Sequence, residues 1–156
     1  MKTEQHVLIV DNDDGFRKAA DLILRKEGYK TSIAWNGQEA LNIIRTTRNN
    51  CHPVDILLTD LRMPDMDGFD LMASMKRERI RIPTVVVTAY GDAETLARLI
   101  HYGVNGYLAK PCTVKDLLDA IRLASLEAAG QPDDVPSSSF DQQYIHTPMQ
   151  TNGRRQ

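Results

Sequence analysis

Five short apolar runs alternate with stretches of helical spacing, and this alternation constrains the fold more than any other feature of the chain. The runs are residues 7–10, 31–34, 56–59, 84–88 and 106–109. Their nearly continuous apolar character is typical of strands in a parallel sheet that is covered on both faces. Between and after them, apolar residues recur at i, i+3 and i+4, as in amphipathic helices. Five strands alternating with five helices predict a doubly wound α/β fold.

Turn and cap residues mark the ends of the expected helices. Gly28 follows the first helical stretch and Gly103 follows the fourth, and glycine commonly ends a helix in this way. Residues 113–116 resemble a capping box, and apolar residues with helical spacing follow them. The fifth helix is therefore expected to begin next to Thr113.

Length, charge and apolar runs limit the class of protein. The chain has 156 residues and a formal net charge of -2, which fits one domain of about 100–200 residues without a basic surface for nucleic acid. The apolar run at 7–10 is shorter than the roughly 7–15 residues of a secretory signal. No run approaches the roughly 18 residues of a membrane span. We expect a soluble, cytoplasmic protein that contacts neither membrane nor nucleic acid.

The composition changes near residue 128. Residues 130–139 are rich in proline, aspartate and serine, and a polar run continues to residue 156. A segment with so few apolar residues cannot offset its ordering entropy by burial. We therefore expect one domain over residues 1–127 and a disordered tail or linker over residues 128–156, too short and polar for a helix-turn-helix module.

Polar side chains stand at the carboxyl ends of four expected strands. The first strand leads into residues 11–14, the third into Asp60 and the fifth into Lys110, while the fourth ends at Thr88. Ligands of doubly wound sheets bind beyond these strand ends, so the side chains are expected to converge at one edge. Each of these side chains has an ordinary explanation on its own, as a helix cap, a strand-end hydroxyl or a surface lysine. These ordinary roles do not require the side chains to meet at one edge, so their joint occurrence favours a functional site. For the carboxylates at 13 and 14, a helix cap and a metal ligand both stay open.

Four segments, taken in order, resemble the receiver domain of bacterial two-component response regulators, the CheY-like family, over roughly residues 5–127. They are residues 8–13 with Arg17, 55–64 extending to Gly68, 87–89, and 106–111. The resemblance implies a flavodoxin-like, five-stranded parallel sheet with strand order 2-1-3-4-5. We interpret Arg17 itself as a solvated helix residue.

The resemblance implies that Asp60 accepts a phosphoryl group from a sensor histidine kinase or a phosphotransfer protein. An acyl phosphate carries negative charge on its oxygens, which must be balanced. Mg2+ is the expected cation, held by Asp11, Asn12, Asp60 and the backbone carbonyl of Arg62. Lys110 and Thr88 would bind the phosphoryl oxygens, and Pro111 is expected to follow a cis peptide bond.

The resemblance also implies an output surface. Tyr107 lies three residues before Lys110, at the position of the family's switch aromatic residue. Thr88 and Tyr107 would change partner binding through the face made by the fourth helix, fifth strand and fifth helix. The partner would be a downstream protein or an effector domain missing from this chain. The domain would assist only its own phosphorylation and dephosphorylation and would not be an enzyme.

The chain departs from the family pattern in two places, and each departure predicts a change in the chemistry of the site. Asn12 stands where the family usually has an acidic residue, so the loss of one negative charge predicts weaker Mg2+ binding. Arg62 and Tyr90 stand two residues after the acceptor and after Thr88, at positions that tune hydrolysis in the family. Their bulk predicts a shielded, long-lived phosphorylated state.

Three other functions have less support in the sequence. A receiver-like interaction domain that acts without phosphorylation is prompted by Asn12, although the presence of Asp60, Thr88 and Lys110 argues against it. A phosphatase of the haloacid dehalogenase type needs a second aspartate two residues after its nucleophile as general acid, and Arg62 stands there. A dinucleotide-binding oxidoreductase needs a glycine-rich loop after the first strand, where this chain has an acidic cluster.

Overall fold

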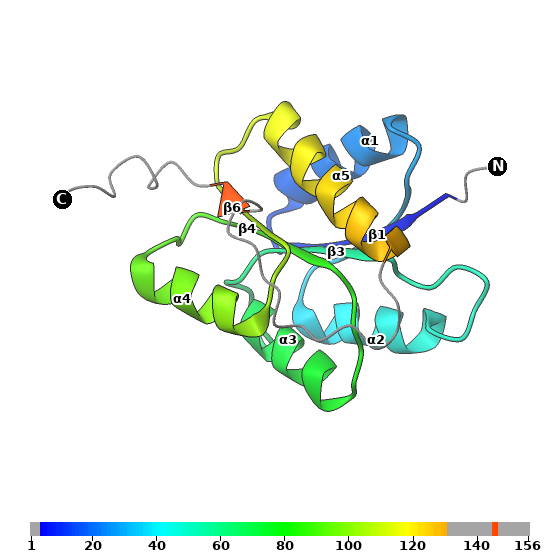
Figure 1. The fold of residues 1–156 in the computed structure, drawn as a ribbon, viewed down its shortest axis with the longest axis horizontal. Coiled ribbons are helices and arrows are strands. Elements are labelled where there is room, and N and C mark those ends of the chain that lie inside the picture. Colours follow the sequence, from blue (N-terminus) through cyan, green and yellow to red (C-terminus); the bar gives the residue numbers. More distant parts are fainter. Residues whose placement is uncertain (1–3, 131–144, 147–156) are drawn as a thin grey trace.

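The structure is a computed structural model that describes residues 4–130 and 145–146. Strands and helices alternate along the chain (Figure 1). The strands are β1 His6–Val10, β2 Lys30–Ala34, β3 Ile56–Thr59, β4 Thr84–Thr88, β5 Gly106–Ala109 and β6 Ile145–His146. The helices are α1 Asp14–Lys26, α2 Gly37–Thr47, α3 Gly68–Arg77, α4 Ala93–Tyr102 and α5 Val114–Gly130. The last three strands of the predicted five have the predicted bounds, and β1 and β2 each begin one residue earlier.

All the strands pair in parallel, in the order β2-β1-β3-β4-β5-β6. The predicted order 2-1-3-4-5 is therefore confirmed. The short strand β6 was not predicted, and it pairs with the outer edge of β5, with Ile145 opposite Tyr107. The order reverses beside β1, so the carboxyl ends of β1 and β3 adjoin at the place where a ligand is expected.

The helices form a layer on each face of the sheet. Figure 1 shows α1 and α5 on one face and α2, α3 and α4 on the other. Within β1, Val7 and Ile9 pack with the α1 and α5 layer, while Leu8 and Val10 pack with the opposite layer. Burying one such side chain contributes about 1.5–3 kcal/mol. Burial on both faces explains why the strands are apolar without alternation.

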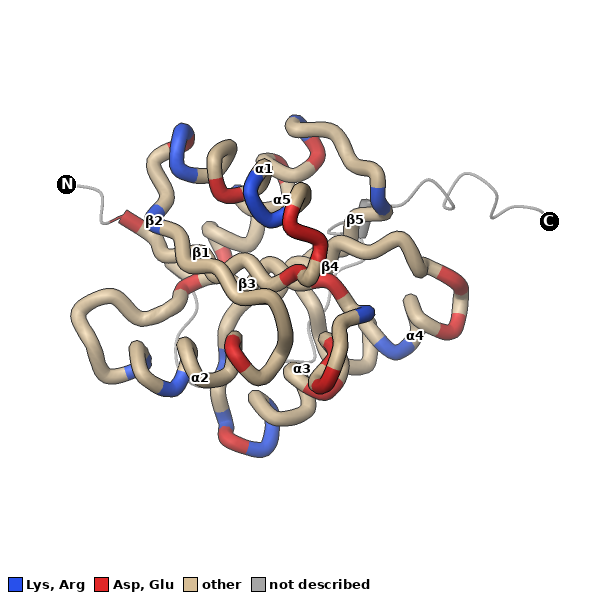
Figure 2. Tube along the Cα trace, turned by 180° about the vertical axis from the view of Figure 1, so that it is seen from behind, with Lys and Arg blue, Asp and Glu red and all other residues tan. Residues whose placement is uncertain are grey.

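Most charged residues lie outside the strands. Figure 2 shows most of the basic and acidic residues on helices and loops, with few along the strands. The carboxyl ends of the central strands are the exception, because Asp11 and Asp60 are both buried there. Ionised groups are rarely buried without a partner, so we expect the two carboxylates to contact a cationic group at this edge.

The predicted helix ends are confirmed. Gly28 and Gly103 adopt φ values of 96° and 72°, in the region that favours glycine. The Thr113 hydroxyl accepts the Asp116 N–H at 3.0 Å, as in the first half of a capping box. None of the helices in the described part of the chain is both long and apolar enough to cross a membrane.

The predicted boundary after residue 127 falls inside α5, which continues to Gly130. Helix propagation adds hydrogen bonds beyond the last apolar position of the pattern, so apolar periodicity alone underestimates the length of a helix. Most of the predicted tail lies outside the described residues. Disorder over 128–156 therefore stays a prediction.

Candidate functional site

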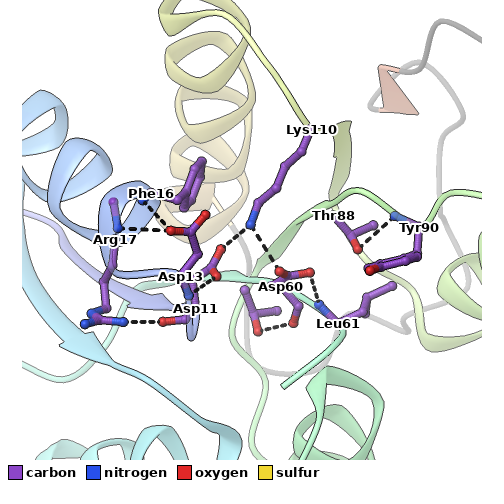
Figure 3. A network of polar contacts seen from close by, with 11 residues as sticks. Asp11, Asp13, Phe16, Arg17, Asp60, Leu61, Thr88, Tyr90 and Lys110 are labelled. Carbon is purple, nitrogen blue, oxygen red and sulfur yellow. Dashed lines mark hydrogen bonds and ion pairs between the residues drawn. The ribbon is translucent and has the colours of Figure 1, made fainter. Parts of the chain in front are cut away.

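Three charged side chains from three strand ends meet at the carboxyl edge of the sheet (Figure 3). The Lys110 Nζ lies 2.6 Å from Asp11 Oδ2 and 3.1 Å from Asp60 Oδ2. The Asp11 side chain is 1% exposed and that of Lys110 is 17% exposed. Asp11 follows β1, Asp60 follows β3 and Lys110 follows β5, so the long lysine side chain brings a positive charge across from a more distant strand.

Burial shapes the charge balance of this cluster. Burial raises the pKa of the Asp11 carboxyl, and the hydrogen bonds from Lys110 and from the Asp13 N–H offset only part of that rise. Burial alone would lower the pKa of Lys110, but its hydrogen bond to Asp11 and the charges of both carboxylates raise it overall. Lys110 is therefore charged at neutral pH, and one ammonium faces two carboxylates. The cluster favours a further cation.

The turn that follows β3 is fixed from several directions. Asp60 Oδ1 accepts the Leu61 N–H at 2.6 Å, and the Thr59 hydroxyl donates to the Asp60 carbonyl at 2.7 Å. A Cβ atom on Gly68 would collide with that carbonyl and would lie 2.9 Å from the Leu61 Cα. The close approach of α3 therefore requires glycine at this position, and it holds the Asp60 carboxylate in one orientation.

The carboxylates at the start of α1 do not join the cluster. Asp13 Oδ1 accepts the N–H groups of Gly15 and Phe16 at 3.0 and 3.4 Å, which is the contact of a helix cap. Asp14 forms ion pairs with Arg17 and Lys18 at 2.5 and 2.9 Å. Of the two interpretations that the sequence left open, the structure shows the cap for Asp13 and surface pairing for Asp14.

The interpretation of Arg17 as a solvated residue was wrong. Arg17 is buried, and its Nη1 donates to the backbone carbonyl of Asp11 at 2.6 Å. One signal in the sequence could have shown this, because Arg17 shares a helix face with the core residues Ala20 and Leu24 at i+3 and i+7. A charged residue on a core-facing stripe needs a buried partner.

Thr88 lies near the cluster without a hydrogen bond to it. Its side chain is buried at the end of β4, and Oγ1 accepts the Tyr90 N–H at 3.2 Å. Within the described residues, that hydroxyl makes no hydrogen bond to Asp60 or Lys110. Figure 3 shows Thr88 on the side of Asp60 toward Tyr90.

Asn12 and Arg62 are exposed and line a hollow of about 510 Å³ beside the turn that follows β3, together with Tyr90, Phe69 and Arg98. The guanidinium of Arg62 lies 4.0 Å from the centroid of the Tyr90 ring. A cation over an aromatic face at this distance is attracted by the ring. The two side chains whose bulk was expected to shield the site are thus stacked on each other.

The predicted Mg2+ ligands are all oxygen donors. Among the described residues, no three His, Cys, Asp or Glu side chains gather as a metal site. The predicted set does not need three, since it adds the Asn12 amide oxygen and a backbone carbonyl to Asp11 and Asp60. Oxygen donors with two buried carboxylates suit a hard divalent cation, and a cation there would stabilise the ionised form of Asp11, whose pKa is raised by burial. The residues present fit Mg2+.

Tyr107 is buried, and burial raises the pKa of its hydroxyl. Its ring extends under the loop after β4, where a Cβ atom on Gly91 would collide with Tyr107 Oη and lie 2.8 Å from Cζ. The Lys110–Pro111 peptide bond is cis, as expected.

Comparison with known proteins identifies the family. The model of the response regulator receiver domain matches residues 7–122. The chain belongs to this family. This receiver domain is 32% identical to sporulation initiation phosphotransferase F of Bacillus subtilis, over 76% of the chain and 91% of the relative.

Two solved structures support the assignment of this receiver domain. A CheY-like receiver domain protein from Methanospirillum hungatei JF-1 has a TM-score of 0.70 and 29% identity, covering 82% of this chain and 100% of that one. The CheX-CheY-BeF3-Mg+2 complex from Borrelia burgdorferi has a TM-score of 0.68 and 25% identity, covering 78% and 88%. Regulatory protein AtoC of Escherichia coli is 32% identical over 75% of this chain, which spans only 24% of AtoC.

Proposed function

We propose that this receiver domain is a phosphorylation-dependent switch that accepts its phosphoryl group on Asp60. The observation that carries the proposal is the Lys110 ammonium lying against both buried carboxylates, Asp11 and Asp60. Asp60 Oδ1 is held by the Leu61 N–H, so the carboxylate is oriented before a donor arrives. An oriented nucleophile beside a fixed positive charge is what phosphoryl transfer requires of a protein.

The transfer would proceed by attack of an Asp60 carboxylate oxygen on the phosphorus of a phosphohistidine in a sensor kinase or phosphotransfer protein. The new O–P bond forms as the N–P bond of the donor breaks, and the histidine keeps that electron pair. The Lys110 ammonium and the Thr88 hydroxyl would bind the phosphoryl oxygens. Mg2+, held by Asp11, Asn12, Asp60 and the Arg62 carbonyl, would supply further positive charge to those oxygens.

Whole-protein mass spectrometry tests this proposal. After incubation with acetyl phosphate and MgCl2, we expect the wild type to gain the mass of one phosphoryl group, and to gain nothing in EDTA. Asp60→Asn should gain nothing under either condition. Asp65→Asn is the control, since Asp65 is exposed and is outside the cluster. A wild type that gains no mass would favour a receiver-like interaction domain that works without phosphorylation.

Output would follow from the loop between β4 and α4. Thr88 ends β4 and Tyr107 lies on the neighbouring strand β5, opposite Val86. Movement of the Thr88 hydroxyl toward a phosphoryl group would break its contact with the Tyr90 N–H and shift the loop that covers the Tyr107 ring. The face made by α4, β5 and α5 would then change its affinity for a downstream protein or an effector domain, within the cytoplasm.

Gly91→Ala tests this coupling. The added Cβ conflicts with the Tyr107 hydroxyl, so we expect the ring to rotate outward and to become exposed without phosphorylation. NMR of the ring protons measures the change, with Gly15→Ala as control, because a Cβ there meets only Asp13 Oδ1, at 3.4 Å. A Tyr107 ring that stays buried in Gly91→Ala would contradict the coupling.

The stacked pair of Arg62 and Tyr90 predicts a long-lived phosphorylated state. The two side chains stack at 4.0 Å and line the hollow beside the turn that follows β3, where they would hinder attack by water on the acyl phosphate. We expect Tyr90→Ala to lose its phosphoryl group several-fold faster than the wild type, as followed by mass after removal of the donor. Arg98→Ala is the control, because Arg98 stacks on Phe69 in the same hollow. Equal decay in Tyr90→Ala and the wild type would contradict the prediction.

A further inference from the structure

Arg17 is a buried cation on the side of the acidic edge away from Lys110. Its side chain is 9% exposed, its Nη1 donates to the Asp11 carbonyl at 2.6 Å, and its Nη2 pairs with Asp14 Oδ1 at 2.5 Å. Figure 3 shows Arg17 and Lys110 approaching Asp11 from different sides. A guanidinium has a rigid fork of donors, so the contact places a positive charge beside Asp11 and also fixes the direction of the Asp11 carbonyl.

Three hydrogen bonds fix the backbone and the side chain of Asp11, and Arg17 forms one of them. The Asp11 N–H donates to the carbonyl of Ala34 at 3.1 Å, and its Oδ1 accepts the Asp13 N–H at 2.8 Å. The carbonyl that Arg17 holds belongs to the peptide unit leading into Asn12. Without Arg17, that peptide unit would be able to rotate. The side chains of Asp11 and Asn12 would then no longer be held in fixed directions.

Arg17 also reaches the end of β2. Its guanidinium carbon lies 6.0 Å from the centroid of the Trp35 ring, at the distance of a cation–aromatic contact. Trp35 is 58% exposed and is the single tryptophan of the sequence. The residue before it, Ala34, is the one whose carbonyl accepts the Asp11 N–H. Asp11 is thus connected to Trp35 by a backbone hydrogen bond and through Arg17.

We propose that Arg17 is a positioning residue for the cation site, and that it transmits cation binding at Asp11 to Trp35. Mg2+ held by Asp11 would compete with Lys110 for the Asp11 carboxylate, and a change in the position of Asp11 would reach Arg17 through the carbonyl of the same residue. The environment of Trp35 changes as a result. This inference rests on the Mg2+ site of the proposed function.

The test is a magnesium titration of the full chain from EDTA, followed by Trp35 fluorescence and by calorimetry. In the wild type we expect a saturable fluorescence change with the midpoint that calorimetry gives. In Arg17→Met, which keeps the bulk and loses both donors, we expect the affinity for Mg2+ to fall by about tenfold, as when a ligand's supporting partner is lost, and the fluorescence change to disappear. Lys18→Met is the matched control, since Lys18 pairs with the same Asp14 and is 75% exposed. It should behave as the wild type does.

Arg17→Lys separates charge from geometry, because lysine keeps the charge and loses the fork. We expect the affinity of Arg17→Lys for Mg2+ to lie between those of the wild type and Arg17→Met. Circular dichroism shows whether Arg17→Met folds in EDTA. If it does not fold, Arg17→Lys tests the positioning role by itself. Wild-type affinity in folded Arg17→Met or in Arg17→Lys would overturn the positioning role. Calorimetric binding by the wild type without a fluorescence change would overturn the link to Trp35.

Failure of this inference is distinguishable from failure of the proposed function. A wild type that neither binds Mg2+ nor gains a phosphoryl group contradicts both. A wild type that binds Mg2+ and is phosphorylated, beside Arg17 variants that match it in affinity and fluorescence, contradicts the inference alone.

Discussion

Lys110→Met is expected to slow phosphorylation of Asp60 by about a hundredfold at saturating Mg2+, the scale for loss of one fixed donor to a charged transition state. The Lys110 ammonium contacts both carboxylates at a buried edge, so no nearby solvent cation replaces it in the same geometry. The rate of mass gain with acetyl phosphate measures the effect. Lys115→Met is the control, because Lys115 pairs with Asp119 on the exposed start of α5 at 2.7 Å.

The same substitution is expected to lower the free energy of unfolding by about 2 kcal/mol, as for a hydrogen bond to a charged group. The pKa of Lys110 is raised in the folded chain, so its stabilising effect is fully present below the usual lysine pKa of 10.5. That effect is lost only as pH rises through the higher folded-state value. An unchanged phosphorylation rate together with unchanged stability at neutral pH would contradict the role given to Lys110.

Asp11→Asn is expected to have opposite effects on stability and function. In EDTA we expect the free energy of unfolding at neutral pH to rise by about 1 kcal/mol, as when a strained functional site is relieved. The reason is that burial raises the pKa of the Asp11 carboxyl in the folded chain, which means that its ionised form is disfavoured there. Mg2+-dependent phosphorylation should be lost because a ligand charge is removed.

The pH dependence of this gain follows from the direction of the shift. Because the folded-state pKa of Asp11 is above the usual 3.8, the unfolded chain releases that proton first as pH rises. The wild type therefore loses stability relative to Asp11→Asn between pH 3.8 and the folded-state pKa, and the difference is constant above it. Denaturant titrations across this range, with Asp65→Asn as control, measure it. A variant less stable than the wild type at neutral pH would contradict the argument.

The sheet and the meeting of charged residues at its carboxyl edge follow from local patterns in the sequence. Strands buried on both faces produce continuous apolar runs, which is why β3, β4 and β5 were predicted with their observed bounds. Parallel pairing then brings the residues after β1 and β3 to adjoining positions. The meeting of Asp11, Asp60 and Lys110 is a consequence of topology, and it was predicted without side-chain detail.

Contacts that depend on side-chain conformation or long-range pairing were not predicted. The buried hydrogen bond of Arg17 to the Asp11 carbonyl depends on a rotamer, and a basic residue on a helix is usually solvated. The pairing of β6 with β5 joins segments separated by α5, and a two-residue strand leaves no periodic pattern. The hydrogen bond of Thr88 to the Tyr90 N–H depends on the loop after β4, whose conformation the sequence pattern does not specify.

The position of the phosphoryl group on the chain decides whether Asp60 is the acceptor. The wild type would be incubated with acetyl phosphate and MgCl2, digested with trypsin and analysed by fragmentation mass spectrometry. The peptide of residues 49–62 contains Asp60 together with Asp55 and His52, so fragmentation distinguishes these acceptors. We predict that the phosphoryl group lies on Asp60. A phosphoryl group on His52, on Asp55 or in another peptide would contradict the assignment of Asp60 as the acceptor.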